Sequence, residues 1–535
     1  MQFNSYRSPV YARNGMVASS QPLASEAGLR ILQQGGNAAD AAVAVAATLN
    51  LTEPTSTGIG GDCFCLYYDN QKKEVFGLNA SGRAPAMLNL DKLNDLGIRD
   101  NLPPLSVHTI TVPGAAAGWV DTVEKFGTMS LKEILEPAIN HAEDGFPVAP
   151  ITARSWQRGV TQLLLGPNAN EMLINGEAPK EGEIMKNPSL ANTFRELAEH
   201  GKSGFYEGRI AESIIDLIQS FEGFMTPDDL KNHKNTFDEP ITVNYRGIDV
   251  YEIPPNGQGI TALMALNVLE GFDLANMKHS SVEHLHTMIE SMRIAFADTR
   301  WYVADPDVVH VPIQELLSKQ YAEARRELID PNKASKDVLK GSPVTSSNTV
   351  YFSVADGEGN ACSFINSNYM GFGTGLIPKG CGFTLQNRGA NFTLQPEHPN
   401  ALAPNKRPYH TIIPGMATKD GELYSSFGVM GGFNQPQGHA QVLVNMIDFG
   451  MNPQQALNAP RFTIRDGTSK GDVALEEGID VATMSILSQM GHAVVPTAGF
   501  ARMIFGRGQI INRNPKNGVL CGGTSPRADG IVVGW

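Results

Sequence analysis

A threonine late in the chain, Thr349, combines a hydroxyl nucleophile with a position that could supply its own base. It follows a polar, strand-poor stretch over residues 330–348 and opens an alternating run over residues 349–356. If the bond between Asn348 and Thr349 is cut, Thr349 gains a free α-amino group, which can take the proton from its own Oγ1 directly or through a water molecule. The pattern therefore predicts an N-terminal nucleophile released by self-cleavage. Taken alone, Thr349 would be an ordinary strand residue, because β-branched side chains favour strands.

Ser367 is a candidate partner for this nucleophile. It lies 18 positions after Thr349, and residues 357–360 have a turn-like composition between two apolar runs. If a hairpin closes there, Ser367 returns opposite Thr349 or its neighbour, and a shift of one residue in register decides which face it uses. A hydroxyl beside Thr349 would orient it, whereas on the other face Ser367 would be a plain strand residue.

Paired glycines at Gly431-Gly432 are a candidate oxyanion hole. They lie between a predicted strand and a predicted helix. Without a Cβ, paired glycines let backbone N–H groups approach a ligand closely. Two such donors aimed at one point would stabilise a tetrahedral intermediate. The alternative interpretation is an ordinary tight turn.

Two further patterns are weaker evidence for a functional site. Residues 371–375 form a partial dinucleotide-binding fingerprint, but no acidic residue about 20 positions later completes it. His284 and His286 lie on a predicted long helix with Glu290, and histidines two positions apart point to different faces, which suits a metal ion poorly. Glu290 and Arg293 are expected to form a structural pair. The sequence predicts neither a cofactor nor a metal site.

The elements that must position these residues are helices at the front of the chain and strands at the back. Helices are predicted over residues 23–32, 38–49 (capped by Asn37), 114–126, 131–143, 282–302 and 439–449. A hairpin is predicted from residues 63–68 and 74–78. Residues 187–300 are otherwise mainly helical, apart from a strand and turn near residues 245–255. This order indicates a layered α/β (α+β) body without internal repeats.

Composition narrows the class of protein. The chain has 535 residues, 41% of them hydrophobic, and a net charge of −13, so nothing favours nucleic acid or an anionic membrane as a partner. No segment has the length and apolarity of a membrane span, and the first residues lack the pattern of a secretory signal. The five cysteines are an odd number without zinc-like spacing, and we expect them to be reduced and mostly buried. A cytoplasmic location is expected.

Several short motifs occur along nearly the whole chain in one characteristic order. They are Gly35-Gly-Asn-Ala-Ala-Asp-Ala-Ala42, Gly58-Ile-Gly-Gly61, Val112-Pro-Gly114, Thr349 with Ser353-Val-Ala-Asp356, Phe372-Gly-Thr-Gly375, Asn405-Lys-Arg-Pro408, Gly431-Gly432 and Ala459-Pro-Arg461. In these motifs the chain resembles the gamma-glutamyltranspeptidase family of N-terminal-nucleophile hydrolases.

The resemblance implies a four-layer αββα sandwich and a self-processing enzyme without a cofactor. Residues 1–348 would become the large subunit and residues 349–535 the small subunit of one body, with a dimer of such heterodimers left open. Thr349 would be the nucleophile and, with Asn348, the processing point. Ser367 stands where the family often has a supporting threonine, and Gly431 and Gly432 would form the oxyanion hole.

Departures from the family pattern concern substrate recognition. Ser81 occupies the position of an arginine that clasps the α-carboxylate of a γ-glutamyl group. Asn391 replaces an aspartate that pairs with the α-ammonium, and His410-Thr411 replaces a Ser-Ser pair that also holds the carboxylate. The segment before Asn405 looks short for the family's lid. Because an Asp-to-Asn change removes the countercharge of an ammonium, these departures argue against a standard γ-glutamyl site.

The pattern around Gly82-Arg83, Arg388 and residues 406–411 looks closer to the branch of the family that includes oxamate amidohydrolase. Arg83, Arg388 and His410 would then be cationic groups near the site, and they suit a small amide that carries a carboxylate. Arg83 and Arg388 could instead form structural salt bridges. Two alternatives stay open at this point: glutathione hydrolysis or γ-glutamyl transfer, and a non-catalytic relative that keeps the fold as a scaffold.

Overall fold

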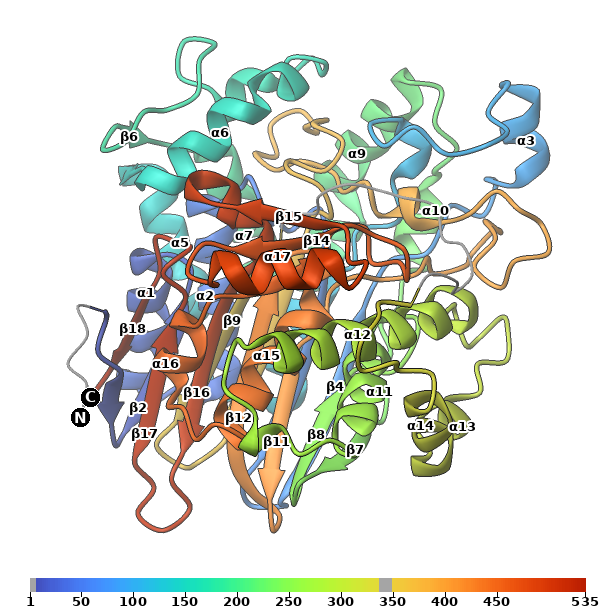
Figure 1. Cartoon of the computed structure of the whole chain (residues 1–535). Coiled ribbons are helices and arrows are strands. Elements are labelled where there is room, and N and C mark those ends of the chain that lie inside the picture. Colours follow the sequence, from blue (N-terminus) through green and yellow to red (C-terminus); the bar gives the residue numbers. More distant parts are fainter. Residues whose placement is uncertain (1–5, 336–348) are drawn as a thin grey trace.

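Two large antiparallel sheets stack face to face and carry helices on both outer faces (Figure 1). The structure is a computed structural model, and it describes residues 6–335 and 349–535. In spatial order, the strands of the six-stranded sheet are β18 (Ile531–Gly534), β2 (Gly15–Ser19), β9 (Val350–Asp356), β10 (Ala361–Ser367), β3 (Asp62–Asp69) and β4 (Glu74–Ala80). Its two central strands therefore come from beyond the predicted cut, and strands from before the cut lie on both sides of them.

The seven-stranded sheet also combines both parts of the chain. In spatial order, its strands are β1 (Val10–Ala12), β17 (Leu520–Thr524), β16 (Arg507–Arg513), β12 (Glu422–Met430), β11 (Gly415–Lys419), β8 (Ile248–Glu252) and β7 (Ile241–Tyr245). A smaller sheet contains β13 (Phe462–Ile464), β14 (Val473–Glu476) and β15 (Val494–Thr497), and β5 (Phe146–Pro147) pairs with β6 (Ile184–Met185).

Helices form the two outer layers. Those on the six-stranded sheet include α1 (Pro22–Gln33), α2 (Ala38–Thr52), α4 (Ala115–Phe126), α5 (Leu131–Asp144) and α7 (Pro188–His200). Those on the seven-stranded sheet include α11 (Gly259–Leu269), α12 (Val282–Tyr302), α15 (Asn434–Ile447) and α16 (Pro453–Asn458). The remaining helices are α3 (Leu90–Asp95), α6 (Pro150–Leu163), α8 (Lys202–Tyr206), α9 (Gly208–Ser220), α10 (Pro227–Lys231), α13 (Ile313–Leu316), α14 (Lys319–Arg326) and α17 (Val481–Gln489).

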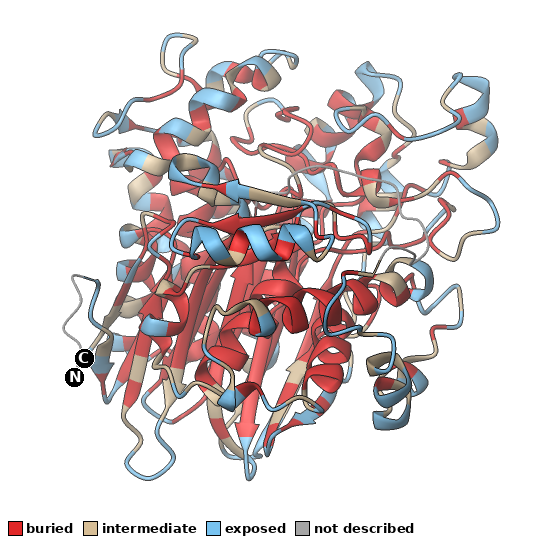
Figure 2. Ribbon diagram, viewed as in Figure 1, coloured by how far each residue is buried: buried red, intermediate tan, exposed pale blue. Residues whose placement is uncertain are grey.

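Strand alternation divides the apolar side chains among three packed layers. Along β9, Tyr351 faces the other sheet, whereas its neighbour Phe352 faces the helices. On the seven-stranded sheet, Ile511 likewise faces inward and Ile510 faces α11, α12 and α15. Figure 2 shows the result, with buried strands in the centre and exposed residues on the outer helix surfaces. The predicted αββα sandwich is confirmed.

Local sequence signals predicted the bounds of several helices and strands closely. Asn37 accepts hydrogen bonds from the Ala39 and Asp40 amides and caps α2 as predicted, although α2 continues to Thr52. Two predictions were wrong. The single strand expected near residues 245–255 is a hairpin of β7 and β8 that begins at Ile241, and α15 begins at Asn434, five residues before the predicted start.

The described helices are all too short or too polar to traverse a lipid bilayer. The five cysteines are free thiols, and all except Cys521 are buried.

Candidate active site

Thr349 and Ser367 lie side by side at the end of the β9–β10 hairpin. Asn366 pairs with Val350, so the next pair along the ladder brings Ser367 opposite Thr349. The two hydroxyl oxygens are 3.0 Å apart, and both side chains are fully buried. The register question raised by the sequence is thus resolved, with Ser367 on the same face as Thr349. Asn348, the other residue of the predicted processing bond, lies outside the described residues.

Arg388 connects this hydroxyl pair to a neighbouring loop. Its Nη2 donates to Ser367 Oγ at 3.1 Å and its Nη1 donates to Thr411 Oγ1 at 2.8 Å. The guanidinium is fully buried, and its carbon lies 4.6 Å from the centre of the Tyr369 ring. Burial lowers the pKa of Arg388 to about 10, so the side chain remains charged at neutral pH. The charged Arg388 guanidinium therefore donates directly to Ser367, whose hydroxyl lies beside that of Thr349.

Asp62 is the counterion of Arg388, and sequence analysis did not identify it. Its Oδ2 lies 3.6 Å from Arg388 Nε, while its Oδ1 accepts hydrogen bonds from the Gly82 amide at 2.9 Å and Gln386 Nε2 at 3.0 Å. Burial alone would raise the pKa of Asp62, but the hydrogen bond from His410 and the charge of Arg388 outweigh it, and the pKa lies below its ordinary value. Asp62 is therefore ionised and forms a buried ion pair with Arg388, as the salt-bridge interpretation expects, and a role for Arg388 in substrate binding stays a prediction.

His410 is a neutral ring rather than the cation that the sequence suggested. Its Nε2 lies 3.0 Å from Asp62 Oδ2, so Nε2 carries the proton, and its Nδ1 accepts from the Ile412 amide at 3.4 Å. Burial and the nearby Arg388 charge lower the pKa of His410 to about 4. Because one charged group already faces Asp62, a second would gain little. The expectation of a cationic His410 is corrected, and its role is to hold Asp62.

Gly431 and Gly432 occupy the turn between β12 and the start of α15, with φ angles of +134° and +58°. Only glycine adopts such angles without strain. Their carbonyls are engaged by the amides of Asn434 and Gln435, which open α15. Among the described residues, neither glycine N–H has an acceptor in the protein. The turn thus presents two amide donors at a helix N-terminus, the arrangement that favours a developing negative charge.

Gln258 links this turn to the arginine. Its side-chain amide donates to the Gly432 carbonyl at 2.8 Å and to the Thr411 carbonyl at 2.6 Å. A continuous path of hydrogen bonds thus runs from Gly432 through Gln258, Thr411 and Arg388 to the nucleophile pair. The glycine turn and Thr349 are parts of one buried network.

Arg507 approaches Thr349 from the seven-stranded sheet. Its Nη2 donates to the Thr349 carbonyl at 3.3 Å and to Ser56 Oγ at 3.1 Å, and its Nη1 pairs with the buried Glu53. Arg507 also pairs across the sheet with Met430, the residue before the glycine turn. It therefore positions Thr349 relative to that turn. Sequence analysis missed Arg507, Glu53 and Gln258, because no local motif connects residues so far apart in the chain.

The contacts of the two remaining predicted site residues, Arg83 and Asn391, do not decide whether they bind substrate. Arg83 pairs with Asp307 at 3.1 Å and donates to the Lys234 carbonyl at 3.2 Å, which favours the salt-bridge interpretation. Asn391 ends a short 3-10 helix (Arg388–Asn391) and is half-buried. Its Nδ2 has no hydrogen-bond partner among the described residues. A role for either residue in substrate binding stays a prediction.

Ser81, at the position of the family's carboxylate-clasping arginine, is fully buried, and its Oγ donates to Asn79 Oδ1 at 2.7 Å. This contact engages the hydroxyl inside the protein, so it does not stand in for the missing guanidinium.

Comparison with known proteins decides the family. The family model described as "Gamma-glutamyltranspeptidase" matches residues 24–535. The chain belongs to the gamma-glutamyltranspeptidase family. It is 37% identical to the glutathione hydrolase-like YwrD proenzyme of Bacillus subtilis (strain 168), over 97% of this chain and 98% of that one. It is 32% identical to the oxamate amidohydrolase proenzyme of Klebsiella pneumoniae, over 98% of each chain.

A solved structure extends the likeness to the fold. The crystal structure of cephalosporin acylase from Bacillus halodurans has a TM-score of 0.92 and 44% identity, covering 100% of this chain and 98% of that one. Members of the gamma-glutamyltranspeptidase family are autoprocessing amide hydrolases and transpeptidases. The chain is accordingly an enzyme, an amidohydrolase whose large and small subunits come from one precursor. The non-catalytic scaffold alternative is not retained.

Proposed function

We propose that this enzyme hydrolyses a small amide that carries a carboxylate and lacks an α-ammonium group, as oxamate does. The observation that carries the proposal is the buried Arg388 guanidinium, whose Nη2 lies 3.1 Å from Ser367 Oγ. A carboxylate beside the reacting amide can replace the neutral Ser367 and Thr411 acceptors. Charge-assisted bonds of this kind are roughly twice as strong as neutral ones.

The chemistry follows from the groups around Thr349. After processing, the free α-amino group of Thr349 takes the Oγ1 proton, and Oγ1 attacks the substrate carbonyl. The N–H groups of Gly431 and Gly432 stabilise the oxyanion. Collapse of the tetrahedral intermediate expels the amine, which leaves with a proton, and water then hydrolyses the threonine ester and restores the enzyme.

A γ-glutamyl substrate has less support. Ser81 lacks the charge of the family's arginine, and Asn391 lacks the charge of the family's aspartate. An α-ammonium group would lose its countercharge there, and a desolvated ammonium without a partner is costly.

A second candidate is the removal of a larger acyl chain, which the likeness to the cephalosporin acylase structure favours, with 44% identity and a TM-score of 0.92. Arg388 could bind a carboxylate on such an acyl group in the same way. The two candidates differ in the length of the acyl chain between the carboxylate and the amide.

A substrate comparison tests the proposal. The processed enzyme is assayed with oxamate, glutathione, γ-glutamyl anilide and a cephalosporin that carries an acidic acyl chain. The expected result is the highest kcat/KM for oxamate. A tenfold or greater preference for glutathione or the anilide overturns the proposal, and a preference for the cephalosporin supports the second candidate.

A further inference from the structure

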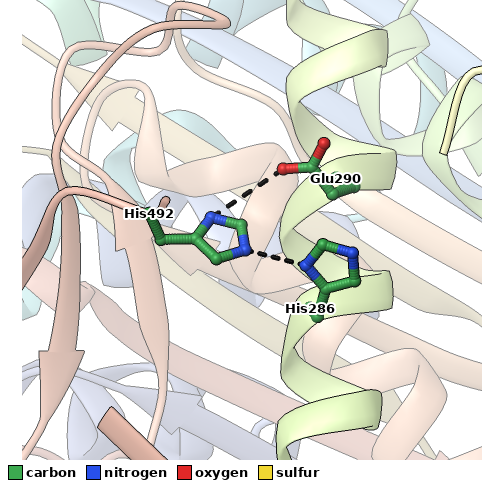
Figure 3. Close-up of side chains that lie close together, drawn as sticks. All are labelled: His286, Glu290 and His492. Atoms are coloured by element: carbon green, nitrogen blue, oxygen red, sulfur yellow. Dashed lines mark hydrogen bonds and ion pairs between the residues drawn. The ribbon is translucent and has the colours of Figure 1, made fainter. Parts of the chain in front are cut away.

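A cluster of two histidines and a glutamate is formed by α12 and the segment between α17 and β15. His286 and Glu290, one helical turn apart on α12, face His492 from the segment between α17 and β15 (Figure 3). His286 Nδ1 is 2.8 Å from His492 Nε2, and His492 Nδ1 is 3.8 Å from Glu290 Oε1. All three side chains are buried, and one potential ligand atom from each lies within 4.8 Å of the others.

Sequence analysis had set this helix aside because His284 and His286 point to different faces. That reasoning holds for His284, whose ring packs against His279 and Phe449. The useful spacing is instead that of His286 and Glu290, four positions apart on one face. The third residue, His492, lies more than two hundred positions later in the chain, and no sequence pattern connects it to His286 and Glu290.

Hydrogen-bond directions leave two acceptor atoms of the cluster facing each other when both rings are neutral. The Asp330 carbonyl, 2.8 Å from His286 Nε2, can only accept, so Nε2 carries the proton and Nδ1 of the neutral ring has a lone pair. His492 Nε2 must then donate to that lone pair. This leaves His492 Nδ1, a second lone pair, facing the Glu290 carboxylate. Both His492 Nδ1 and Glu290 Oε1 are buried without a hydrogen-bond partner among the described residues.

We propose that His286 Nδ1, His492 Nε2 and Glu290 Oε1 bind a divalent transition-metal ion, with Zn²⁺ as the best fit. Two imidazoles and one carboxylate form a ligand set that Zn²⁺ favours, and three protein ligands leave one tetrahedral position for water. Zinc–nitrogen bonds of roughly 2.0–2.1 Å put two ligand nitrogens roughly 3.3 Å apart. The two rings, now 2.8 Å apart, therefore need to separate by about 0.5 Å, and the Glu290 carboxylate, within 4.8 Å, has to approach them. On binding, His492 transfers its proton from Nε2 to Nδ1, which then faces Glu290.

The groups around the cluster would orient these ligands. The Asp330 carbonyl fixes the tautomer of His286, and the Ser335 amide donates to Glu290 Oε2 at 2.9 Å, which leaves Oε1 to face inward. Such contacts to the outer atoms of ligands are typical of metal sites.

One positive group competes with the ion. The Arg293 Nε lies 3.5 Å from Glu290 Oε1, which confirms the expected structural pair. The terminal nitrogens of Arg293 point elsewhere, to the carbonyls of Ser469 and Gly471, and the carboxylates of Asp466 and Asp472 lie close enough to offset its charge. The arginine is therefore held beside the cluster rather than in it.

The proposed ion would tie three segments together. His286 and Glu290 belong to the predicted large subunit and His492 to the small one. Residues 330–335, which precede the predicted cut, supply the two outer contacts, and Ala334 also donates to the Met490 carbonyl at 2.8 Å. A metal ion there would join the subunits after processing.

Metal titration of the processed enzyme tests the site. After chelator treatment, the wild-type protein is expected to bind one Zn²⁺ per chain and to melt at a higher temperature when Zn²⁺ is added. Glu290→Gln, which keeps the shape of the side chain, and His492→Gln are each expected to weaken binding at least tenfold, the lower range for disturbing such sites. His310→Gln, at an exposed histidine outside the cluster, should bind Zn²⁺ like the wild type.

Co²⁺ provides a readout on the wild-type protein alone, in case both variants fail to fold. The visible absorption of bound Co²⁺ distinguishes four-coordinate nitrogen and oxygen ligation from the hydrated ion. The proposal is overturned if the wild type takes up no Zn²⁺, if Glu290→Gln binds it as tightly as the wild type, or if bound Co²⁺ keeps the spectrum of the hydrated ion.

Discussion

Arg388 Nη2 donates a 3.1 Å hydrogen bond to Ser367 Oγ, and the same hydroxyl lies 3.0 Å from Thr349 Oγ1. A substrate group that draws the guanidinium toward itself would therefore alter the hydrogen bonding of the nucleophile's partner. If the substrate carries the carboxylate proposed above, its recognition by Arg388 and the alignment of Thr349 are coupled through Ser367.

Replacement of Arg388 tests this coupling. Arg388→Gln is expected to raise KM for a carboxylate-bearing amide at least about 30-fold. The substitution would remove the partner of the buried substrate carboxylate, and such a loss costs about 2–5 kcal/mol. Steady-state kinetics with oxamate measure the effect, and a melting curve checks that Asp62 has not destabilised the variant. Arg195→Gln is the control, since Arg195 forms an exposed ion pair with Glu143 and is not a predicted site residue, and it should leave KM within about twofold. Equal effects of the two substitutions would contradict the assignment.

Self-cleavage depends on the Thr349 hydroxyl. Thr349→Ala is expected to remain a single band on a denaturing gel and to be inactive, because the same Oγ1 performs processing and turnover. Thr349→Ser keeps a hydroxyl and should still be cut. The small fragment of the wild type should begin at Thr349, as N-terminal sequencing would show. An intact wild-type chain with full activity would refute the mechanism.

The glycine turn can be tested with a control for backbone strain. Gly432→Val is expected to lower kcat by about 10²–10³, the range for losing one oxyanion donor. Gly450 has a φ of +63°, close to the +58° of Gly432, and a Cβ there meets nothing within 4 Å. Gly450→Val therefore carries similar strain outside the site and should keep a normal kcat. A normal kcat in Gly432→Val would disprove the assigned role.

Stability is expected to fall with acidification because of His410. Its pKa of about 4 in the folded protein lies below its ordinary value of 6.5, so the unfolded chain binds the extra proton between these values. The contribution of His410 to the free energy of unfolding is complete above pH 6.5. It is lost as the pH falls toward 4, by at most about 1.4 kcal/mol per pH unit.

Denaturant unfolding at pH 7 and pH 5 measures this loss. His233, with a pKa also lowered to about 4, adds to the wild-type slope. His410→Gln should therefore reduce the slope by about one proton rather than abolish it. An unchanged slope in that variant would show that His410 titrates normally.

Much of the fold was predictable because its signals are local. The turn at residues 357–360 sets the β9–β10 hairpin, and Asn37 caps α2 within three residues of its own position. The start of α15 was missed because Pro436 and Gly438 disfavour a helix. Pro436 lies in the first turn, where proline's missing N–H costs no hydrogen bond, and so the helix tolerates it.

The site was predictable only in part, since its charges depend on distant partners. Nothing near His410 in the sequence indicates that its ring faces Asp62, 348 positions away, or that burial and the Arg388 charge keep the ring neutral. Arg507 reaches the Thr349 carbonyl across 158 positions for the same reason. Motif order predicted Thr349 as the nucleophile, while the protonation states and the counterions required the folded sheets.

The interleaved strand order has a consequence for how this protein must be made. In the six-stranded sheet, β9 and β10 lie between β2 and β3, so residues synthesised first leave two strand edges open until residues 350–367 emerge. Exposed strand edges favour aggregation. Separate genes for the two subunits would release each half with its edges uncovered. Synthesis as one polypeptide keeps the missing strands tethered beside their gap, and the cut can then follow without undoing a single strand pairing.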